Sequence, residues 1–294
     1  MAPPLLLQRL LGDVPLDRFF AEHWGRAPLA RRGTAAQLTH LATWPVVERL
    51  VETPGCDLLV VRDGSVHPDA RPASAQEARA RFAEGWSLAL RQPDAHDAGL
   101  AEVGRTLVAE LCGTLNLHVY ATPPSRGSFG WHYDPEEVFI LQTQGTKRYL
   151  LRENTVNPRP LLETTGRAGE LARETSAPAV EVQLSAGDVL YIPGGWWHAT
   201  EAVEDSLSVS LGLMPPTPLA VLDFLRTQLL QDPRWRERLP PLGRAAPQAD
   251  PEKLQQLAEL FGGLGAELQG RLKDPRLSLR FLAALTMAGM GGRR

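Results

Sequence analysis

Lysine and cysteine are both scarce in this chain of 294 residues. Of the 31 lysine and arginine residues, three are lysines, namely Lys147, Lys253 and Lys273. A lysine in the middle of the chain therefore carries more information than it would in an average sequence. The two cysteines, Cys56 and Cys112, stand in no CxxC pattern and beside no histidine. Their placement excludes a disulfide framework and a zinc knuckle, and it predicts two free thiols.

Long apolar runs and a strong charge of one sign are also missing. No window approaches the about 20 apolar residues that a transmembrane helix needs. The N-terminal run Leu5-Leu6-Leu7 is too short for a signal peptide and has no basic flank. The net charge of −3 gives no electrostatic reason to bind nucleic acid. We expect a soluble, cytoplasmic protein that contacts neither a membrane nor nucleic acid directly.

The first 113 residues or so are predicted to be mainly helical. The apolar spacing of 16–24 and of 99–111 is typical of amphipathic helices. A capping box, Ser74-Ala75-Gln76-Glu77, predicts the start of another helix. One short strand, 57–62, interrupts this region.

Between Leu115 and Leu213 the sequence changes to short strands separated by turns. We expect strands at 115–120, 138–142, 147–151, 180–184, 188–192 and 206–213. The turn Gln144-Gly145-Thr146 predicts that the second and third of these strands form a hairpin. Many short strands with frequent turns favour a mainly β core, a sandwich or barrel of the jelly-roll kind that includes the cupins.

Helical patterns return after Pro215-Pro216. We expect helices at 219–230, from Asp250-Pro251 onward, and at 277–287. The sequence thus predicts two domains, a β core with an N-terminal helical part at 1–215 and a C-terminal helical region at 216–294.

Two histidines and one aspartate form the candidate site. His132 and Asp134 lie two residues apart on or beside an expected strand, where they point to the same face. His198 follows another strand and the turn Gly194-Gly195-Trp196-Trp197. Two imidazoles and one carboxylate can take one face of an octahedron around a mononuclear non-haem Fe(II) and leave three positions open. The alternative for His132 and Asp134 alone is a surface histidine next to a turn aspartate.

Lys147 lies fifteen residues after His132, at the start of an expected strand. An oxygenase that uses 2-oxoglutarate chelates iron through the 2-oxo acid end. The far carboxylate then needs a cation inside the barrel, because an unpaired buried charge is costly. A lysine on a neighbouring strand would supply that cation. The alternative is an ordinary exposed strand lysine.

Several segments together resemble the JmjC/cupin-like hydroxylases, closest to their ribosomal oxygenase branch. The resemblance covers roughly residues 1–230. The similar segments are Trp24–Leu29, Tyr120–Pro124, Gly130–Asp134, Val138–Gln142, Gly145–Arg148 and Gly187–His198.

The resemblance implies a double-stranded β-helix core that uses Fe(II), 2-oxoglutarate and O2 to hydroxylate a side chain of a protein or peptide, with succinate and CO2 as co-products. It makes His132, Asp134 and His198 the catalytic metal ligands and Lys147 the residue that binds the co-substrate. Residues 1–215 would then be the JmjC/cupin-like catalytic domain. The ribosomal branch continues with a dimerising helical region and a winged helix. Here the residues after 215 predict helices without an evident winged helix, and these helices could join two copies in a homodimer.

Tyr120 and Asn116 are secondary candidates for the co-substrate site. Both have even numbers on the same expected strand and share one face, from which either could hydrogen-bond 2-oxoglutarate. The alternative is that both are ordinary strand residues.

Four other functions compete with hydroxylation. An N-methyl-lysine or N-methyl-arginine demethylase would use the same site and release formaldehyde. A cupin isomerase or dioxygenase that does not use 2-oxoglutarate usually offers a His-x-His pair and a further glutamate, whereas this chain has Asp134 and Lys147. A cupin that binds metal without turning over 2-oxoglutarate is a further alternative, against which the complete set of three ligands argues. A zinc hydrolase lacks support because no helical HExxH pattern is present.

Overall fold

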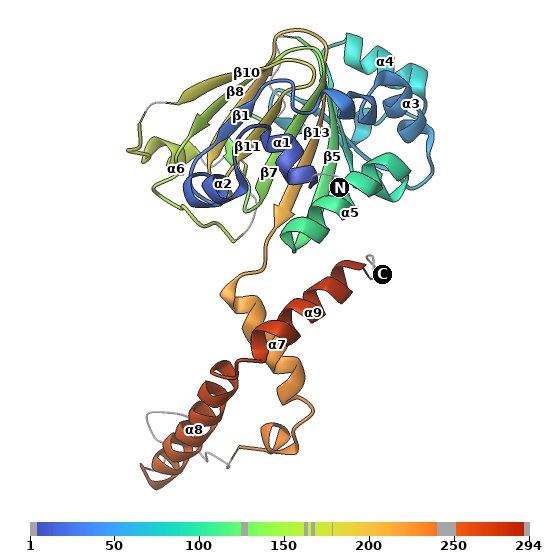
Figure 1. Cartoon of the computed structure of the whole chain (residues 1–294). Helices are drawn as coiled ribbons and strands as arrows, with labels where there is room; N and C mark the ends of the chain where they lie inside the picture. The colour runs from blue at the N-terminus through green and yellow to red at the C-terminus, as the bar shows by residue number, and fades with distance from the viewer. Residues whose placement is uncertain are drawn as a thin grey trace. The chain divides into compact units, whose positions relative to one another are not determined.

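A computed structural model describes residues 5–124, 129–161, 164–165, 168–177, 179–239 and 251–290. The chain divides into two units, Met1–Pro215 and Pro216–Arg294, and each is described by itself. The first unit holds the strands and the second is helical (Figure 1).

A large antiparallel sheet forms the centre of the first unit. Its eight strands run in the order β1-β11-β7-β13-β5-β4-β2-β3. The last of them in the sequence, β13, lies between β5 and β7 and pairs with both. The strands are β1 (Leu29–Arg31), β2 (Asp57–Arg62), β3 (Ser65–Val66), β4 (Ser87–Arg91), β5 (Thr114–Thr122), β7 (Glu137–Gln144), β11 (Val189–Ile192) and β13 (Ser206–Met214).

A smaller antiparallel sheet of five strands faces the large one. Its order is β10-β8-β12-β6-β9. The strands are β6 (His132–Tyr133), β8 (Lys147–Arg152), β9 (Thr164–Thr165), β10 (Val180–Leu184) and β12 (Trp197–Ala202).

The alternation of side chains along each strand divides the apolar residues between two cores. Phe139 and Leu141 of β7 belong to a core between the large sheet and its covering helices. Val138 and Ile140 of the same strand point the other way and pack with Tyr149 and other residues of the small sheet. Strand β7 is therefore buried on both faces, which explains its run of four apolar residues, Val138–Leu141.

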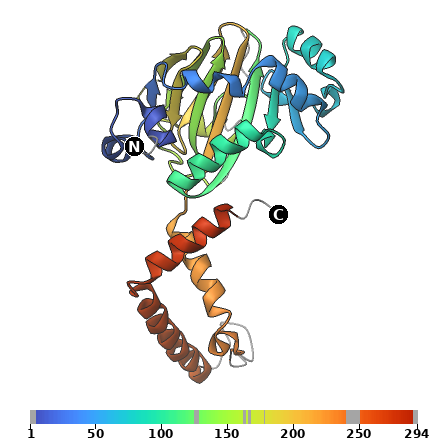
Figure 2. The same cartoon turned by 45° about the vertical axis from the view of Figure 1, so that its right-hand side comes forward.

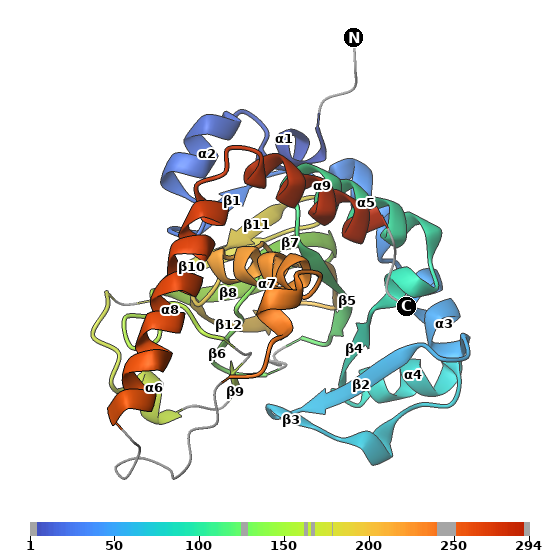
Figure 3. The ribbon, with the colours of Figure 1, turned by 90° about the horizontal axis from the view of Figure 1, so that it is seen from below.

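Helices cover the outer face of the large sheet. Helix α5 lies across the sheet, and its Leu100, Val103 and Leu107 enter the outer core (Figure 2). Helices α3 and α4 lie beside β2 and β4 (Figure 3). The elements are α1 (Leu6–Leu11), α2 (Leu16–Glu22), η1 (Ala36–Leu41), α3 (Trp44–Glu52), η2 (Pro68–Ala70), α4 (Ala75–Ala83), η3 (Pro93–Ala95), α5 (Ala98–Leu111) and α6 (Ala168–Ala172).

Local signals in the sequence account for where these helices begin. The Ser74 side chain accepts a hydrogen bond from the Glu77 N–H at 3.2 Å, and the Glu77 carboxylate accepts one from the Ala73 N–H. Asp97 caps α5 by accepting from the Leu100 N–H at 2.9 Å. The predicted class, a mainly β core of the double-stranded β-helix type with added helices, is confirmed.

The N-terminal part contains more strands than the sequence predicted. Strand β2 has the expected bounds, but β1, β3 and β4 also join the large sheet, at its two ends. The expectation of one strand in this region was therefore wrong. Strand β4 has the sequence Ser-Leu-Ala-Leu-Arg, in which leucine and alanine favour helices. The segment forms a strand because it pairs with β2 and β5 on either side.

The predicted hairpin between 138–142 and 147–151 was also wrong. Strand β7 pairs with β11 and β13 in the large sheet, whereas β8 pairs with β10 and β12 in the small one. The turn at Gly145, whose φ is +69°, carries the chain from one sheet to the other. A turn signal shows that the chain reverses but not which strands it joins.

The second unit is helical in its described part. Helix α7 packs against α9 through Phe224 and Phe281, whose ring centroids are 5.6 Å apart. Ion pairs between Asp232, Arg271 and Glu267 connect η4 to α8. The elements are α7 (Pro218–Leu229), η4 (Pro233–Arg236), α8 (Pro251–Leu272) and α9 (Leu277–Met290). No described helix of the chain is long and apolar enough to cross a membrane.

Candidate metal centre

Two short strands of the small sheet bring His132 and His198 together. The residues are direct partners in the pairing of β6 with β12, and their ring centroids are 4.0 Å apart. Each Nδ1 lies near a backbone carbonyl oxygen two residues earlier, at 2.9 Å from Gly130 and at 3.1 Å from Trp196. A carbonyl can only accept, so Nδ1 carries the proton in both rings. In the neutral form of each ring, Nε2 therefore has a lone pair for a metal ion.

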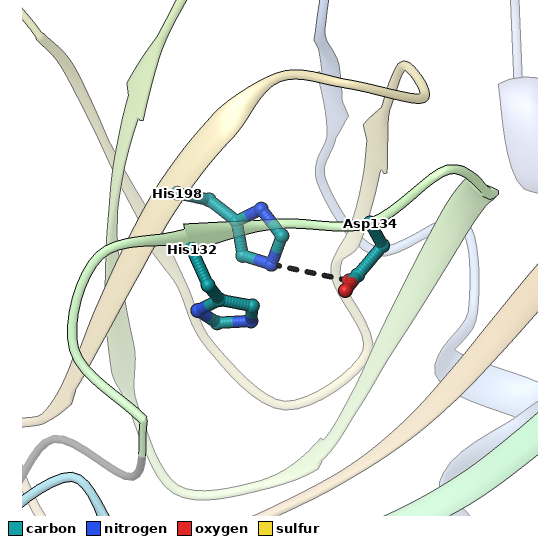
Figure 4. Close-up of side chains that lie close together, drawn as sticks. All are labelled: His132, Asp134 and His198. Carbon is teal, nitrogen blue, oxygen red and sulfur yellow. Dashed lines mark ion pairs between the residues drawn. The ribbon is translucent and has the colours of Figure 1, made fainter. Parts of the chain in front are cut away.

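Asp134 completes the group from the residue after β6. Its Oδ2 lies 3.6 Å from the His198 Nε2. One ligand atom from each of the three residues can be chosen so that all lie within 4.8 Å of one another (Figure 4). The Asp134 carbonyl oxygen accepts a hydrogen bond from the Gly195 N–H at 2.7 Å, which joins this loop to the turn before His198.

The surroundings keep His198 neutral. Burial lowers its pKa, and the neighbouring His132 lowers it further, while the nearby Asp134 carboxylate acts in the opposite direction. A neutral imidazole is the form that binds a metal ion. The site therefore does not need to lose a proton from His198 before it can accept a metal near neutral pH.

The three residues line a pocket between the two sheets. The pocket is open to solvent, and its empty space, including the solvent at its mouth, is about 450 Å³. Its wall also contains apolar side chains from β7 and β11, which limit the entry of water. The lining residues are Tyr120, Phe129, His132, Asp134, Val138, Ile140, Lys147, Tyr149, Ile192, His198, Thr200 and Ser210.

Lys147 lies in the same pocket and is the first residue of β8. Its side chain is buried, with 3% of the residue exposed. Its Nζ donates to the Thr122 hydroxyl at 3.2 Å and lies 5.6 Å from the ring centroid of Tyr120. Burial lowers the pKa of Lys147 to about 8. Among the described residues no carboxylate forms an ion pair with this ammonium group.

The two secondary candidates lie in different places. Tyr120 is on the pocket wall. Asn116, four residues earlier on β5, is exposed and its amide donates to the Glu136 carboxylate. The side chain of Asn116 therefore serves a contact beside the pocket and does not line it.

Sequence reasoning did not single out Phe129, Tyr149 or Thr200 as pocket residues. Tyr149 stands two residues after Lys147, and Thr200 stands two residues after His198. The period of two along β8 and β12 is the signal that would have found both. Phe129 lies outside any strand, and no periodicity points to it.

Comparison with known proteins agrees with this geometry. Residues 103–220 match a family model described as "JmjC domain". The chain is 29% identical over 240 residues to the "Bifunctional lysine-specific demethylase and histidyl-hydroxylase NO66" of Drosophila grimshawi, a match that covers 77% of this chain and 33% of the relative. The Drosophila melanogaster protein of the same name is 27% identical over 228 residues, covering 71% and 33%. The chain thus spans about a third of the length of the curated relatives that it matches.

Solved structures of an Escherichia coli protein share the fold. The ribosomal oxygenase YcfD in complex with cobalt and 2-oxoglutarate superimposes with a TM-score of 0.59 at 19% identity, covering 93% of this chain and 71% of that one. Another structure of YcfD gives a TM-score of 0.57 at 20% identity, covering 92% and 70%. At this identity the likeness shows the fold. Together with the match of residues 103–220 to the JmjC domain, it agrees with the resemblance read from the sequence.

Proposed function

We propose that this chain is an Fe(II)- and 2-oxoglutarate-dependent oxygenase that hydroxylates a side chain of a protein or peptide substrate. The observation that carries the proposal is the buried ammonium group of Lys147 in the same pocket as His132, Asp134 and His198. The three ligands alone are compatible with several metals and reactions. An unpaired buried charge is unfavourable, so a buried cation that pairs with no described carboxylate favours the binding of an anionic ligand.

The donor set fits Fe(II). Two imidazoles and one carboxylate that lie close together in one pocket are the ligands of a non-haem iron site with open positions. His132, Asp134 and His198 would hold the ion. The metal and 2-oxoglutarate together supply the activation of O2 and the oxidation of a substrate C–H bond, with succinate and CO2 as co-products.

The inner pocket fits the distal carboxylate of 2-oxoglutarate. Folding has already removed water from the Lys147 ammonium group, which costs free energy. A carboxylate that pairs with this group offsets part of that desolvation cost. Thr122 orients the ammonium group through its hydroxyl. Tyr120 stands beside the lysine on the pocket wall and can donate a further hydrogen bond from its phenol.

The remaining wall keeps the reaction away from bulk water. Val138, Ile140 and Ile192 present apolar side chains to the pocket. Low polarity there strengthens the attraction between Lys147 and a carboxylate, and it protects reactive species from side reactions.

The test is a comparison of succinate release by the metal-loaded full chain after O2 is admitted, with candidate peptides present. His132→Ala and Asp134→Ala should lose turnover and Co(II) binding, whereas His40→Ala, at an exposed position, should keep both. Lys147→Met should retain Co(II) but lose 2-oxoglutarate binding, whereas Lys273→Met should keep both. Full turnover by the His132 variant would overturn the metal assignment. Metal binding without any 2-oxoglutarate turnover would favour a cupin that only binds metal.

Demethylation is the second candidate, because the name of the curated relatives includes a lysine-specific demethylase as well as a histidyl-hydroxylase. The two reactions share the site and differ in their products. Formaldehyde release from a methylated peptide would identify a demethylase, and a mass increase of one oxygen atom in the substrate would identify a hydroxylase.

For partners, we infer a protein or peptide substrate and a homodimer formed through the C-terminal helices. The dimer is supported by the apolar side chains that the second unit exposes in the single chain, including Leu219, Phe261 and Leu279. We infer a cytoplasmic location, supported by the two free cysteines, Cys56 and Cys112. Direct binding to nucleic acid is not expected at a net charge of −3.

A further inference from the structure

Two glutamates, Glu136 and Glu137, follow closely after Asp134, and their side chains contact opposite faces of the large sheet. Asp134 is followed by Pro135, Glu136 and Glu137, the last of which begins β7. Adjacent residues of an extended chain point to opposite faces. Glu136 turns toward Asn116 of β5, and Glu137 turns toward Tyr191 of β11 on the outer face.

Glu137 is the unusual member of this pair because it is almost fully buried. The residue is 8% exposed, and its partner Tyr191 is 1% exposed. The Tyr191 hydroxyl donates to the Glu137 carboxylate and accepts from the Gly25 N–H at 2.8 Å. Burial raises the pKa of Glu137, and the hydrogen bond from Tyr191 opposes that shift. Burying a carboxylate costs free energy, and an apolar side chain would fill the same space without that cost. The carboxylate and its hydrogen-bond donor therefore indicate that Glu137 holds neighbouring segments in position.

Tyr191 connects Glu137 to the turn before His198, because β11, which carries Tyr191, ends at Ile192 and leads directly into that turn. Gly194 and Gly195 form the turn that enters β12, in which His198 is the second residue. A Cβ on Gly194 would lie 2.8 Å from the Pro135 carbonyl oxygen, so the turn and the loop after Asp134 touch backbone to backbone. The Gly195 N–H donates to the Asp134 carbonyl oxygen in the same contact. The distance between the Asp134 and His198 side chains therefore depends on this junction.

The N-terminal segment packs against Tyr191 on the outer face of the large sheet. The Trp24 ring stacks on Tyr191 with centroids 6.1 Å apart and an interplanar angle of 9°. The next residue, Gly25, supplies the N–H that fixes the Tyr191 hydroxyl. The segment Trp24–Leu29, which the sequence resemblance included without a role, thus reaches the metal centre through Tyr191 and Glu137.

We propose that Glu137 is a positioning residue for the metal centre, held in place by Tyr191 and Gly25. Through its hydrogen bond with Tyr191 it ties the end of β11, which leads into the turn before His198, to the start of β7 after Asp134, and so sets the separation of these two ligands. The inference rests on the proposed function, since it needs a divalent metal to bind at His132, Asp134 and His198. It predicts a loss of metal affinity in variants that leave all three ligands in place.

The test measures Co(II) binding by the full chain, through calorimetry and through the visible absorption of the bound ion. Glu137→Ala should weaken Co(II) binding about 10- to 100-fold and change the absorption spectrum, the range typical when a group that orients a ligand is removed. Glu137→Gln keeps an acceptor oxygen and should recover part of the affinity. Tyr191→Phe should weaken binding less than Glu137→Ala. Hydrogen exchange of the Gly195 amide should accelerate in Glu137→Ala.

Two controls separate positioning from general loss of stability. Glu201→Gln changes a carboxylate of β12 that pairs with Arg148 at the surface, and it should bind Co(II) as the wild type does. Leu50→Ala removes a fully buried side chain of α3, so it should lower the unfolding free energy without changing the Co(II) spectrum.

The outcomes distinguish this inference from the proposed function. A wild type that binds no Co(II) would refute the metal site itself. A wild type that binds Co(II), with Glu137→Ala folded and equal to it in affinity and spectrum, would overturn the role of Glu137 alone. If Glu137→Ala does not fold, then Glu137→Gln and Tyr191→Phe decide, and wild-type affinity and spectra in both would overturn the inference.

Discussion

The ammonium group of Lys147 is surrounded by the Thr122 hydroxyl and the rings of Tyr120 and Tyr149, a setting that attracts an anion. Its pKa is about 8 because burial disfavours the charged form. A bound carboxylate favours the charged form and raises that pKa again. Binding of a dicarboxylate above pH 8 must therefore be accompanied by uptake of a proton.

This linkage predicts how co-substrate affinity depends on pH. Below pH 8 the lysine is already charged, so affinity for 2-oxoglutarate should change little with pH on its account. Above pH 8 affinity should fall by up to about tenfold per pH unit, since one proton is taken up. Calorimetry of the Co(II)-loaded chain between pH 7 and pH 9 measures this slope. A comparable slope in Lys147→Met would assign the pH dependence to another group.

The sequence singled out most of the candidate site residues because they carry an unusual chemical signal. A His-x-Asp pair, a histidine after a Gly-Gly-Trp-Trp turn and a rare lysine can all be seen without a structure. The structure brings His132, Asp134 and His198 together and places Lys147 in the same pocket. Thr200 and Tyr149 carry no such signal, and only the strand geometry identifies them. Asn116 shares the parity of Tyr120, yet Glu136 draws its side chain away.

At the scale of elements, strands β6 and β12 are held from the side opposite to the metal centre. Tyr133 and Trp197 alternate with the two histidines, and their rings contact each other at 4.7 Å between centroids. The Tyr133 hydroxyl donates to Glu170 at 2.7 Å and accepts from the Asn157 amide at 3.0 Å. The aromatic pair thus supports the strands, while the hydroxyl connects them to α6 and to the loop after β8.

Tyr133→Phe separates these two contributions. The variant keeps the ring and loses both hydrogen bonds, so the unfolding free energy should fall by about 1–2 kcal/mol. Its Co(II) affinity should stay near that of the wild type. Tyr133→Ala also removes the ring contact, and it should cost about 3–5 kcal/mol and weaken Co(II) binding as well. Equal Co(II) affinity in both variants would show that the aromatic pair does not support the histidines. Denaturant unfolding and calorimetry supply the two measurements.

The turn at Gly145, which connects β7 to β8, leads to a prediction about the free energy of unfolding. Its φ is +69°, and a Cβ there would lie 2.0 Å from the Asp205 carbonyl oxygen. Gly145→Ala should therefore cost more than the about 1–2 kcal/mol of a left-handed backbone conformation alone. Gly33→Ala is a matched control, because Gly33 has φ +70° with no atom within 4 Å of the added Cβ. Equal losses in thermal or denaturant unfolding would contradict the close approach at Gly145.

The helices and strands were predicted unevenly. Helix α5 and strands β2 and β10 were located to within a residue, because periodicity and caps are local. The pairing of β7 and β8 was not, because which strands pair depends on contacts between distant parts of the chain. The short strands β1 and β6 have two or three residues each, too few for any periodicity to appear.

At the scale of the whole molecule, the second unit exposes several large apolar side chains in the single chain. Leu279 is 70% exposed and Leu282 is 50% exposed, both on α9. Apolar surfaces of this kind favour self-association, and a two-fold symmetric pair is the commonest arrangement. We expect a homodimer at micromolar concentration.

Leu279→Asp combined with Leu282→Asp should shift the mass in solution from dimer to monomer. Analytical ultracentrifugation measures the change. Leu161→Asp is the control, since Leu161 is 89% exposed but belongs to the first unit. A wild type that sediments as a monomer at every concentration would remove the proposed dimer and leave the metal centre unaffected.

The central place of β13 has a consequence for the order in which the protein is made. Strand β13 is the last described strand of the first unit, yet it separates β5 from β7 in the large sheet. Until residue 214 has left the ribosome, the strands already made can form only two half-sheets, each with an edge that lacks its partner. Such edges invite pairing with other chains. We therefore expect a translation product that stops short of β13 to be a client for chaperones and proteases, and not a smaller folded protein.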